Sequence, residues 1–193
     1  MRFEKTYIPY GGYWSTPFCK WQGSFSNVSS LSLAAQVSKK FLAQREISAE
    51  SFDSMLLGFT VPQKSSFYGG PWVSALIGAE GISGPIISQA CATGARVLAN
   101  AGAEIEAGGS GRKLTITTDR CSNGPHMYYP NPAGPGGTGK KEDWVMDNVG
   151  TDPWARNPML QTAENVAQGE GITREEQDQL TLVRHAQYQK ALE

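Results

Sequence analysis

The sequence has little cysteine, no excess of either charge and no long apolar run. Its 193 residues include 3 cysteines, which form neither a CxxC pair nor a spacing typical of a metal site: Cys19, Cys91 and Cys121. An odd and sparse set fits a reducing compartment better than a disulfide framework. The net charge of -1 gives no basic surface for nucleic acid or for an anionic membrane. We therefore expect no metal, no nucleic-acid partner and no structural disulfide.

No stretch approaches the roughly 18 consecutive apolar residues that a membrane-spanning helix needs. The first five residues, MRFEK, also lack the apolar run of a signal peptide. Hydrophobic residues nevertheless make up 39% of the chain, which is enough for a real core. The sequence thus predicts a cytoplasmic protein of one domain, or of one domain plus a lobe, without a membrane partner.

Segments typical of strands alternate with segments typical of helices. Strands are expected at residues 5–12, 52–61, 85–90 and 113–118, and helices at residues 31–45, 71–79, 91–107 and 161–168. A last helix should start at Thr173, because Thr173 and Glu176 have the spacing of a capping box. Residues 121–139 are rich in proline and glycine and are expected to form an irregular loop. This order predicts an α/β fold built in layers.

Cys91 lies where a short apolar run meets an alanine-rich segment. A cysteine at such a strand-to-helix junction is close to unpaired backbone N–H groups, and these favour an anion such as a thiolate. The helix that follows carries few polar residues, whereas a surface helix would show a polar face. We therefore expect this helix to be buried between layers and Cys91 to lie at the floor of a site.

The other residues with chemical potential carry weaker signals. His126 lies in the predicted loop after the last strand, and is either a substrate contact or a surface loop residue. His185 lies among the residues of the last helix, where a surface or packing role is the simpler interpretation. Cys121 and Cys19 are interpreted as small packing residues rather than as nucleophiles.

Three segments resemble the thiolase family. The sequence QACATG at residues 89–94 resembles the nucleophile segment of thiolases, although β-ketoacyl synthases look similar there. The sequence FDSMLLG at residues 52–58 is similar to the thiolase strand that precedes this segment. TAENVA at residues 162–167, followed by ITREEQD at residues 172–178, matches the lid region of thiolases closely. The lid match favours thiolases over the synthases, and the resemblance covers nearly the whole chain.

This resemblance implies a layered α-β-α-β-α thiolase fold and a reaction by covalent catalysis. Thiolases catalyse the thiolytic cleavage of an acyl-CoA or the reverse Claisen condensation through a cysteine thioester, with coenzyme A as a substrate and no permanently bound cofactor. Cys91 matches the nucleophile, and Met159 matches a methionine beside the acyl and pantetheine end of CoA. Biosynthetic members often have a histidine before that methionine, whereas Pro158 stands here. This difference disfavours a short acetoacetyl substrate, and the aromatic residues between positions 126 and 154 would suit a bulkier acyl group.

The resemblance also implies a division of the chain and a need for a partner. Residues 1–119 would form the N-terminal α/β half and residues 120–193 part of the lid. The family's Asn-Glu-Ala-Phe, Gly-His-Pro and second cysteine motifs do not occur in this sequence. Three hypotheses follow: an N-terminal part of a thiolase, a subunit that completes its site with a partner chain, and a β-ketoacyl synthase relative. In each case we expect a homo-oligomer or a hetero-oligomer.

Overall fold

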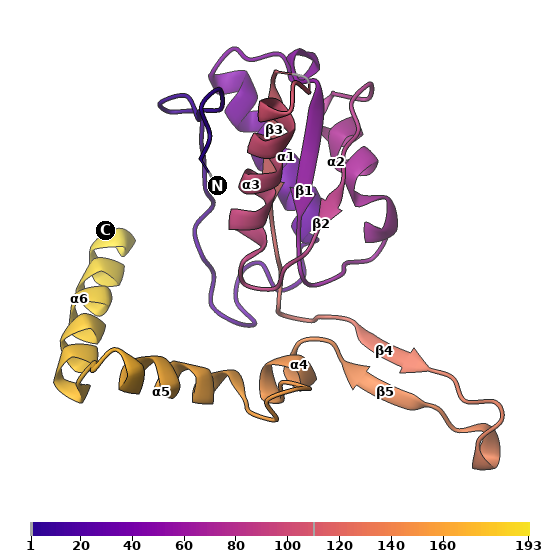
Figure 1. Ribbon diagram of the computed structural model, residues 1–193, viewed down its shortest axis with the longest axis vertical. Coiled ribbons are helices and arrows are strands. Elements are labelled where there is room, and N and C mark those ends of the chain that lie inside the picture. The colour runs from indigo at the N-terminus through magenta and orange to yellow at the C-terminus, as the bar shows by residue number, and fades with distance from the viewer. Residues whose placement is uncertain (1, 110) are drawn as a thin grey trace. The chain divides into compact units, whose positions relative to one another are not determined.

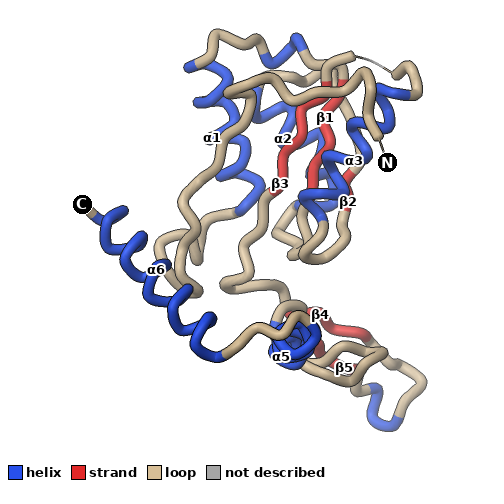
Figure 2. The backbone as a smooth tube through the Cα atoms, turned by 60° about the vertical axis from the view of Figure 1, so that its left-hand side comes forward, coloured by secondary structure: helices blue, strands red, loops and turns tan. Residues whose placement is uncertain are grey.

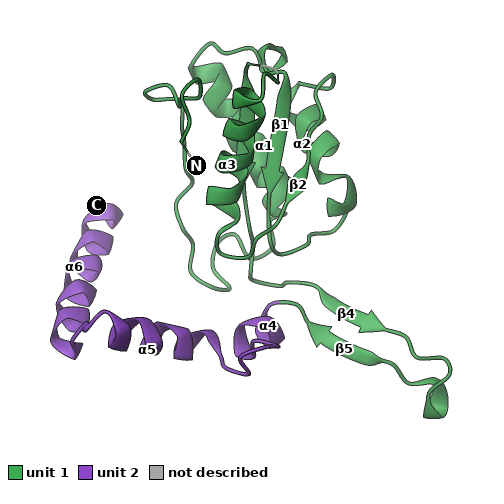
Figure 3. Cartoon of the chain, viewed as in Figure 1, with its two compact units in different colours: residues 1–144 green, residues 145–193 purple. Residues whose placement is uncertain are grey.

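The computed structural model describes residues 2–109 and 111–193. The chain forms two compact units, Met1–Trp144 and Val145–Glu193 (Figure 3). The predicted division at residues 119 and 120 concerns the family's architecture and stays a prediction. Within the described residues, no helix is long and apolar enough to cross a membrane.

The first unit is a small parallel sheet with helices on both faces (Figure 1). The strands β1 (Ser54–Gly58), β2 (Ile86–Ile87) and β3 (Lys113–Thr117) lie in the order β2-β1-β3. In the parallel register, Leu57 is opposite Ile86 on one side and Ile116 on the other. Helix α1 (Ser30–Gln44) precedes β1, while α2 (Gly69–Ile77) and α3 (Thr93–Glu106) connect β1 to β2 and β2 to β3. These elements confirm the predicted α/β class.

The alternation of side chains along β1 separates two cores. Met55 and Leu57 pack with Leu31 of α1 and Val73 of α2, and each of these four side chains is fully buried. On the opposite face, Leu56 packs with Val97 and Ala101 of α3. Figure 2 shows the same arrangement, with α1 and α2 on one side of the strands and α3 on the other. Since both faces of β1 are covered, its sequence is apolar at nearly every position.

Helix α3 approaches β1 most closely at Gly58. A methyl group on Gly58 would lie 2.7 Å from Cγ2 of Val97 and 2.8 Å from Cγ2 of Thr93. Real Cβ atoms essentially never come this close to another heavy atom. The glycine therefore lets the first turn of α3, which follows Cys91, lie directly on the sheet.

Helix α3 is buried on one side only, which corrects the expectation of a helix covered all round. Its buried residues are Thr93, Val97, Ala101 and Gly102, whereas Leu98 is 48% exposed. The described residues cover the face that meets β1, and the apolar face containing Leu98 remains open.

The predicted strand at residues 5–12 is wrong. The carboxylate of Glu106 on α3 accepts hydrogen bonds from this segment. The backbone N–H groups of Glu4 and Lys5 donate to its Oε1 over 3.0 and 2.6 Å. The Thr6 hydroxyl donates to the same carboxylate over 3.0 Å. Since these groups are satisfied by one side chain, the segment runs along α3 without joining a sheet.

The prediction that residues 121–139 are wholly irregular is also wrong. Strand β4 (His126–Tyr129) pairs antiparallel with β5 (Lys140–Asp143), so that Tyr129 is opposite Lys140. A short 3₁₀ turn at Pro135–Gly137 lies within the connection. The proline and glycine residues correctly predicted an irregular connection. They gave no sign that the segments on either side of it, β4 and β5, pair as strands.

The second unit contains the helices α4 (Met146–Gly150), α5 (Met159–Gly169) and α6 (Arg174–Leu192). The predicted capping box is confirmed at the start of α6. The Glu176 N–H donates to the Thr173 hydroxyl over 3.2 Å, and the Thr173 N–H donates to the Glu176 carboxylate over 2.8 Å.

Candidate active site

Cys91 lies between the carboxyl end of β2 and the start of α3. Its side chain is exposed and forms no disulfide. The preceding residue, Ala90, has a φ of 44°, a left-handed conformation that is uncommon for a residue other than glycine. Since the three strands are parallel, the residues that follow β1 and β3 lie at the same edge as Cys91. In open α/β sheets, ligands bind at this edge.

Two threonines hold the backbone immediately before Cys91. The Thr93 hydroxyl donates to the carbonyl oxygen of Ala90 over 2.7 Å and accepts from the backbone N–H of Gln89 over 2.8 Å. The Thr60 hydroxyl, which follows β1, donates to the same Ala90 oxygen over 3.2 Å. The two hydroxyl oxygens are 3.3 Å apart. The peptide before the cysteine is thus held from α3 and from the end of β1.

Asp119 holds Thr60 in turn. The backbone N–H of Thr60 donates to both carboxylate oxygens of Asp119 over 3.0 Å, and the N–H of Val61 donates to one of them over 2.7 Å. Burial of the carboxylate raises the pKa of Asp119 above its usual value, and the hydrogen bonds from Val61 and Thr60 offset part of that rise. On the other side of this turn, the indole N–H of Trp144 donates to the Thr60 carbonyl oxygen over 3.1 Å.

A second thiol, that of Cys121, is close enough to Asp119 and Cys91 for their charges to act on it. Cys121 follows β3 by four residues, and the pKa of its thiol is raised. The largest cause is burial, and the negative charges of Asp119 and of Cys91 add to it. The side chains of Cys121 and Cys19 are both exposed, so their interpretation as small buried packing residues is wrong.

Among the interactions of the described residues, none joins His126 to this network. His126 is the first residue of β4, its side chain is 73% exposed, and its Nε2 lies 3.9 Å from Oδ2 of Asp143. Among the contacts of the described residues, none joins its imidazole to Cys91. His185 is an exposed residue of α6, as expected. A substrate contact for His126 stays a prediction.

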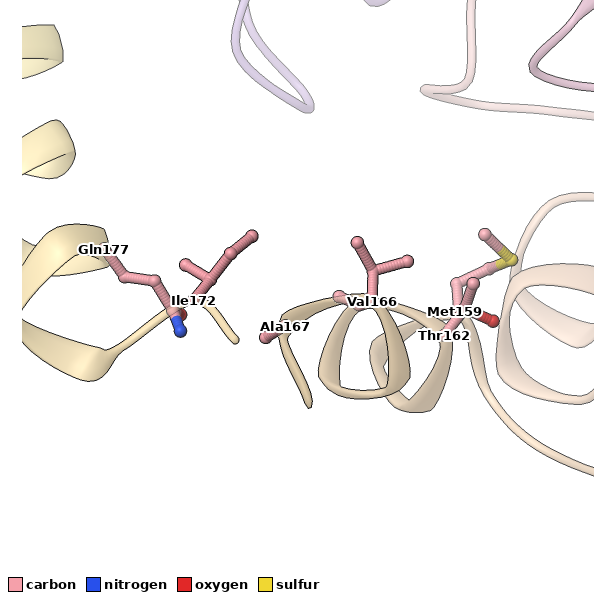
Figure 4. Close-up of a pocket in the computed structure, with 7 residues that line it drawn as sticks. Met159, Thr162, Val166, Ala167, Ile172 and Gln177 are labelled. Carbon is pink, nitrogen blue, oxygen red and sulfur yellow. The ribbon is translucent and has the colours of Figure 1, made fainter. Parts of the chain in front are cut away.

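Met159 is the first residue of α5 and lines a cavity of about 430 Å³ within the second unit. Figure 4 shows its side chain beside Thr162, with Val166 further along α5 and Ile172 after the helix. The lining is mostly apolar and suits an aliphatic group. A role for Met159 beside an acyl chain stays a prediction.

Among residues 2–109 and 111–193, no group of three or more His, Cys, Asp and Glu side chains could hold a metal ion. The sequence did not single out Thr60, Thr93 or Asp119 as functional residues. One signal could have found Thr60 and Asp119: each is a polar residue shortly after a buried strand.

A family model of the thiolase N-terminal domain matches residues 13–193 of the chain. The chain belongs to the thiolase family. The match covers both the Cys91 segment and the α5–α6 region, so the resemblance seen in the sequence is confirmed for nearly the whole chain.

Curated thiolases are similar to this chain over part of their length. An acetyl-CoA acetyltransferase of Yarrowia lipolytica is 27% identical over 168 residues, which are 86% of this chain and 42% of that protein. A mitochondrial acetyl-CoA acetyltransferase of Gibberella zeae is 28% identical over 183 residues, or 92% of this chain and 42% of that protein. The chain thus spans less than half the length of these curated relatives. Since one relative is mitochondrial, the expected cytoplasmic location stays a prediction.

Solved thiolases share the fold. The Bacillus anthracis acetyl-CoA acetyltransferase superposes with a TM-score of 0.77 at 24% identity, covering 89% of this chain and 44% of that one. The human mitochondrial 3-ketoacyl-CoA thiolase, solved in complex with CoA, gives a TM-score of 0.76 at 24% identity over 91% of this chain and 45% of that one. The expected fold, the N-terminal half of a thiolase, is therefore confirmed.

Proposed function

We propose that this thiolase chain carries the acyl-accepting cysteine of an acyl-CoA C-acyltransferase. The thiolate of Cys91 would attack the thioester carbonyl of an acyl-CoA, forming a new carbon–sulfur bond. The bond to the CoA sulfur then breaks, and CoA leaves as a thiolate that takes up the proton lost by Cys91. CoA is thus a substrate, and no permanent cofactor is needed.

One observation carries this proposal. An exposed and unpaired thiol follows a peptide in a left-handed conformation, at the carboxyl edge of a parallel sheet. Strained backbone of this kind is concentrated at functional sites, where the surrounding structure holds it in place. The names of the relatives, which are acyltransferases that use acetyl-CoA, support the same chemistry.

Intact-mass spectrometry tests the proposal directly. The purified chain is incubated with acetyl-CoA and with a longer acyl-CoA, and peptide mapping locates any acyl group. We expect one acyl group on Cys91, with release of an equal amount of CoA. Cys91→Ser should abolish the adduct, whereas Cys19→Ser, a change at an exposed cysteine elsewhere, should leave it. An adduct that persists in Cys91→Ser, or no adduct at all, contradicts the proposal.

We further propose that another polypeptide supplies the groups that speed the acylation of Cys91 and carry out condensation, so that the chain alone is acylated slowly. The sequence contains 2 histidines, and the contacts described for His126 do not join it to Cys91, while His185 is an exposed residue of α6. No described contact thus pairs Cys91 with a histidine, which supports a general base supplied by another polypeptide. The exposed apolar side chains of Leu98 on α3 and Ile86 on β2 support an interface on the first unit.

Product analysis distinguishes this two-part site from a self-sufficient enzyme. With acetyl-CoA, the chain alone should give the Cys91 adduct without a ketoacyl product. Addition of a polypeptide with the C-terminal thiolase motifs should give the product and a larger particle in size-exclusion chromatography. Formation of the ketoacyl product by the chain alone would overturn this second proposal.

A further inference from the structure

The backbone before Cys91 adopts a conformation that alanine does not favour. Ala90 has a φ of 44°, although it lacks the conformational freedom of glycine. Such a residue keeps its conformation only where surrounding contacts hold it. The direction in which the next side chain, Cys91, leaves the backbone depends on those contacts.

The contacts converge on the carbonyl oxygen of Ala90. It accepts from Thr93 over 2.7 Å and from Thr60 over 3.2 Å. Thr93 is buried, with 5% of its surface exposed, and it belongs to the first turn of α3. Thr60 approaches from a different element, the end of β1. The oxygen is thus held from two directions, which fixes the plane of the peptide between Ala90 and Cys91.

Thr60 is itself held in place from both sides. Asp119 accepts its N–H and that of Val61, and Trp144 donates to its carbonyl oxygen. Asp119 follows β3, and Trp144 follows the β4–β5 hairpin, so residues far apart in the sequence fix this one turn. None of them contacts the thiol in the described interactions.

We propose that Thr60 is a positioning residue for Cys91, which holds the Ala90–Cys91 peptide through its hydroxyl and is itself anchored by Asp119. This inference rests on the proposed role of Cys91 as acyl acceptor. The hydroxyl restricts the thiol to the orientation in which it meets the acyl carbonyl. Displacement of a reacting atom by about 1 Å can cost about 10²-fold in rate, so a single hydrogen bond to the preceding peptide can matter.

Thr60→Val and Thr60→Ser test the proposal in the full chain. Valine keeps the shape of threonine and removes the hydroxyl, whereas serine keeps the hydroxyl. We expect Thr60→Val to slow acyl transfer from acetyl-CoA to Cys91 by roughly tenfold or more. Thr60→Ser should return the rate to within a few-fold of the original. Thr115→Val, the same change on β3, serves as the matched control and should leave the rate unchanged.

A second readout does not depend on acyl transfer. Iodoacetamide labels each cysteine at its own rate, and peptide mass spectrometry gives the ratio of Cys91 to Cys19 labelling. Thr60→Val should change this ratio several-fold and Thr60→Ser should restore it. If the original chain forms no acyl adduct, the proposed function fails, but the labelling ratio still decides whether Thr60 positions the thiol.

Two results would overturn the inference. The first is an unchanged labelling ratio in Thr60→Val. The second is an equal change in Thr60→Val and Thr60→Ser, because the hydroxyl would then not be the cause. Circular dichroism and thermal melting check the fold. If Thr60→Val lowers the melting temperature by more than a few degrees, Thr60→Ala removes the same hydroxyl without adding apolar bulk and takes its place.

Discussion

At the scale of single residues, the environment of Cys121 leads to a prediction about its reactivity. Burial, Asp119 and Cys91 all raise the pKa of its thiol. Because only the thiolate reacts with iodoacetamide, we expect Cys121 to be labelled more slowly at neutral pH than free N-acetylcysteine. Its labelling rate should rise at a more alkaline pH than that of the free thiol.

Peptide mass spectrometry over a range of pH gives this curve for Cys121. In Asp119→Asn the curve should move toward lower pH, because one of the negative charges that disfavour the thiolate is gone. Labelling of Cys121 at the same rate and pH as the free thiol would contradict the prediction.

The sequence pointed to Cys91 as a candidate nucleophile, a role that stays a prediction, but it did not reveal what holds the backbone before this residue. Cys91 can be recognised as a candidate from the sequence because the pattern around it is local: an apolar run, a cysteine and an alanine-rich helix follow one another directly. The contact of Thr60 with Ala90 joins residues 30 positions apart. The anchoring of Thr60 by Asp119 spans 59 positions. Such contacts depend on the strand order β2-β1-β3, which the residues by themselves do not specify.

At the scale of elements, the packing of α3 on β1 predicts a cost for any side chain at position 58. Gly58→Ala would place its methyl group against Val97, Thr93 and Thr117. Since two of these atoms belong to α3, the helix must shift, and we expect a loss of about 1–3 kcal/mol in the free energy of unfolding. Labelling of Cys91 should change as well, because Thr93 is displaced.

Gly94→Ala is the matched control for Gly58→Ala. A methyl group on Gly94 meets no described atom within 4 Å, and alanine favours helix more than glycine by about 1 kcal/mol. Urea denaturation should therefore show a small gain for Gly94→Ala and a loss for Gly58→Ala. Equal effects would mean that the close approach at Gly58 does not limit the packing.

The capping box of α6 gives a prediction for the second unit. Thr173→Ala removes the hydroxyl that accepts the Glu176 N–H, and the helix should lose helicity at its start. The hydrogen bonds from Thr173 also lower the pKa of Glu176. Their contribution is present above the usual glutamate pKa of about 4.3, and it is lost as the pH falls through the lowered value.

Circular dichroism of the chain at neutral and acidic pH measures this effect. Thr181→Ala is the control within the same helix, because its hydroxyl only donates to the Gln177 carbonyl oxygen inside the helix. It should keep or slightly raise the helicity. A loss of helicity that is equal in the two variants would contradict the capping argument.

Helices were easier to predict than strands for a physical reason. The bounds of α1, α3 and α5 agree within a few residues with those predicted from the sequence, since helical periodicity and caps are local signals. The expected strand at residues 85–90 shortens to Ile86–Ile87, and β4 and β5 were missed. A strand exists only where a partner pairs with it, and the partner of β4 lies beyond a connection of ten residues, 130–139.

At the scale of the whole molecule, the thiolase fold followed from the family resemblance, whereas the alternating order of predicted strands and helices gave only a layered α/β protein. Residues 5–12 illustrate the limit of predicting a strand from a local sequence pattern. Their pattern is typical of a strand, but the backbone donors of Glu4 and Lys5 reach the Glu106 carboxylate on α3 instead. One acidic side chain, 101 positions from Lys5, decides where the N-terminal segment lies.

This attachment predicts how the N-terminal segment responds to pH and to mutation. The hydrogen bond from the Lys5 N–H is the largest cause that lowers the pKa of Glu106, with further contributions from Thr6 and Glu4. The ionised carboxylate therefore holds the segment above the usual glutamate pKa of about 4.3, and the attachment weakens as the pH falls through the lowered value. Glu106→Gln should weaken it at every pH at which Glu106 is ionised, because a neutral acceptor binds N–H groups less strongly than a carboxylate.

Hydrogen exchange measured by mass spectrometry reports on this attachment. We expect faster exchange of residues 4–6 in Glu106→Gln than in the original chain, and a smaller difference between the two as the pH is lowered after correction for the intrinsic exchange rate. Glu80→Gln, a change at an exposed residue between α2 and β2, should leave exchange of the N-terminal segment as it is. If exchange of residues 4–6 is the same in Glu106→Gln and Glu80→Gln, the Glu106 carboxylate does not hold the segment. The remaining contacts to α3 are then the Phe3 ring, which lies against Gly102, and the Thr6 hydroxyl, which donates to the Gly102 carbonyl oxygen over 3.2 Å.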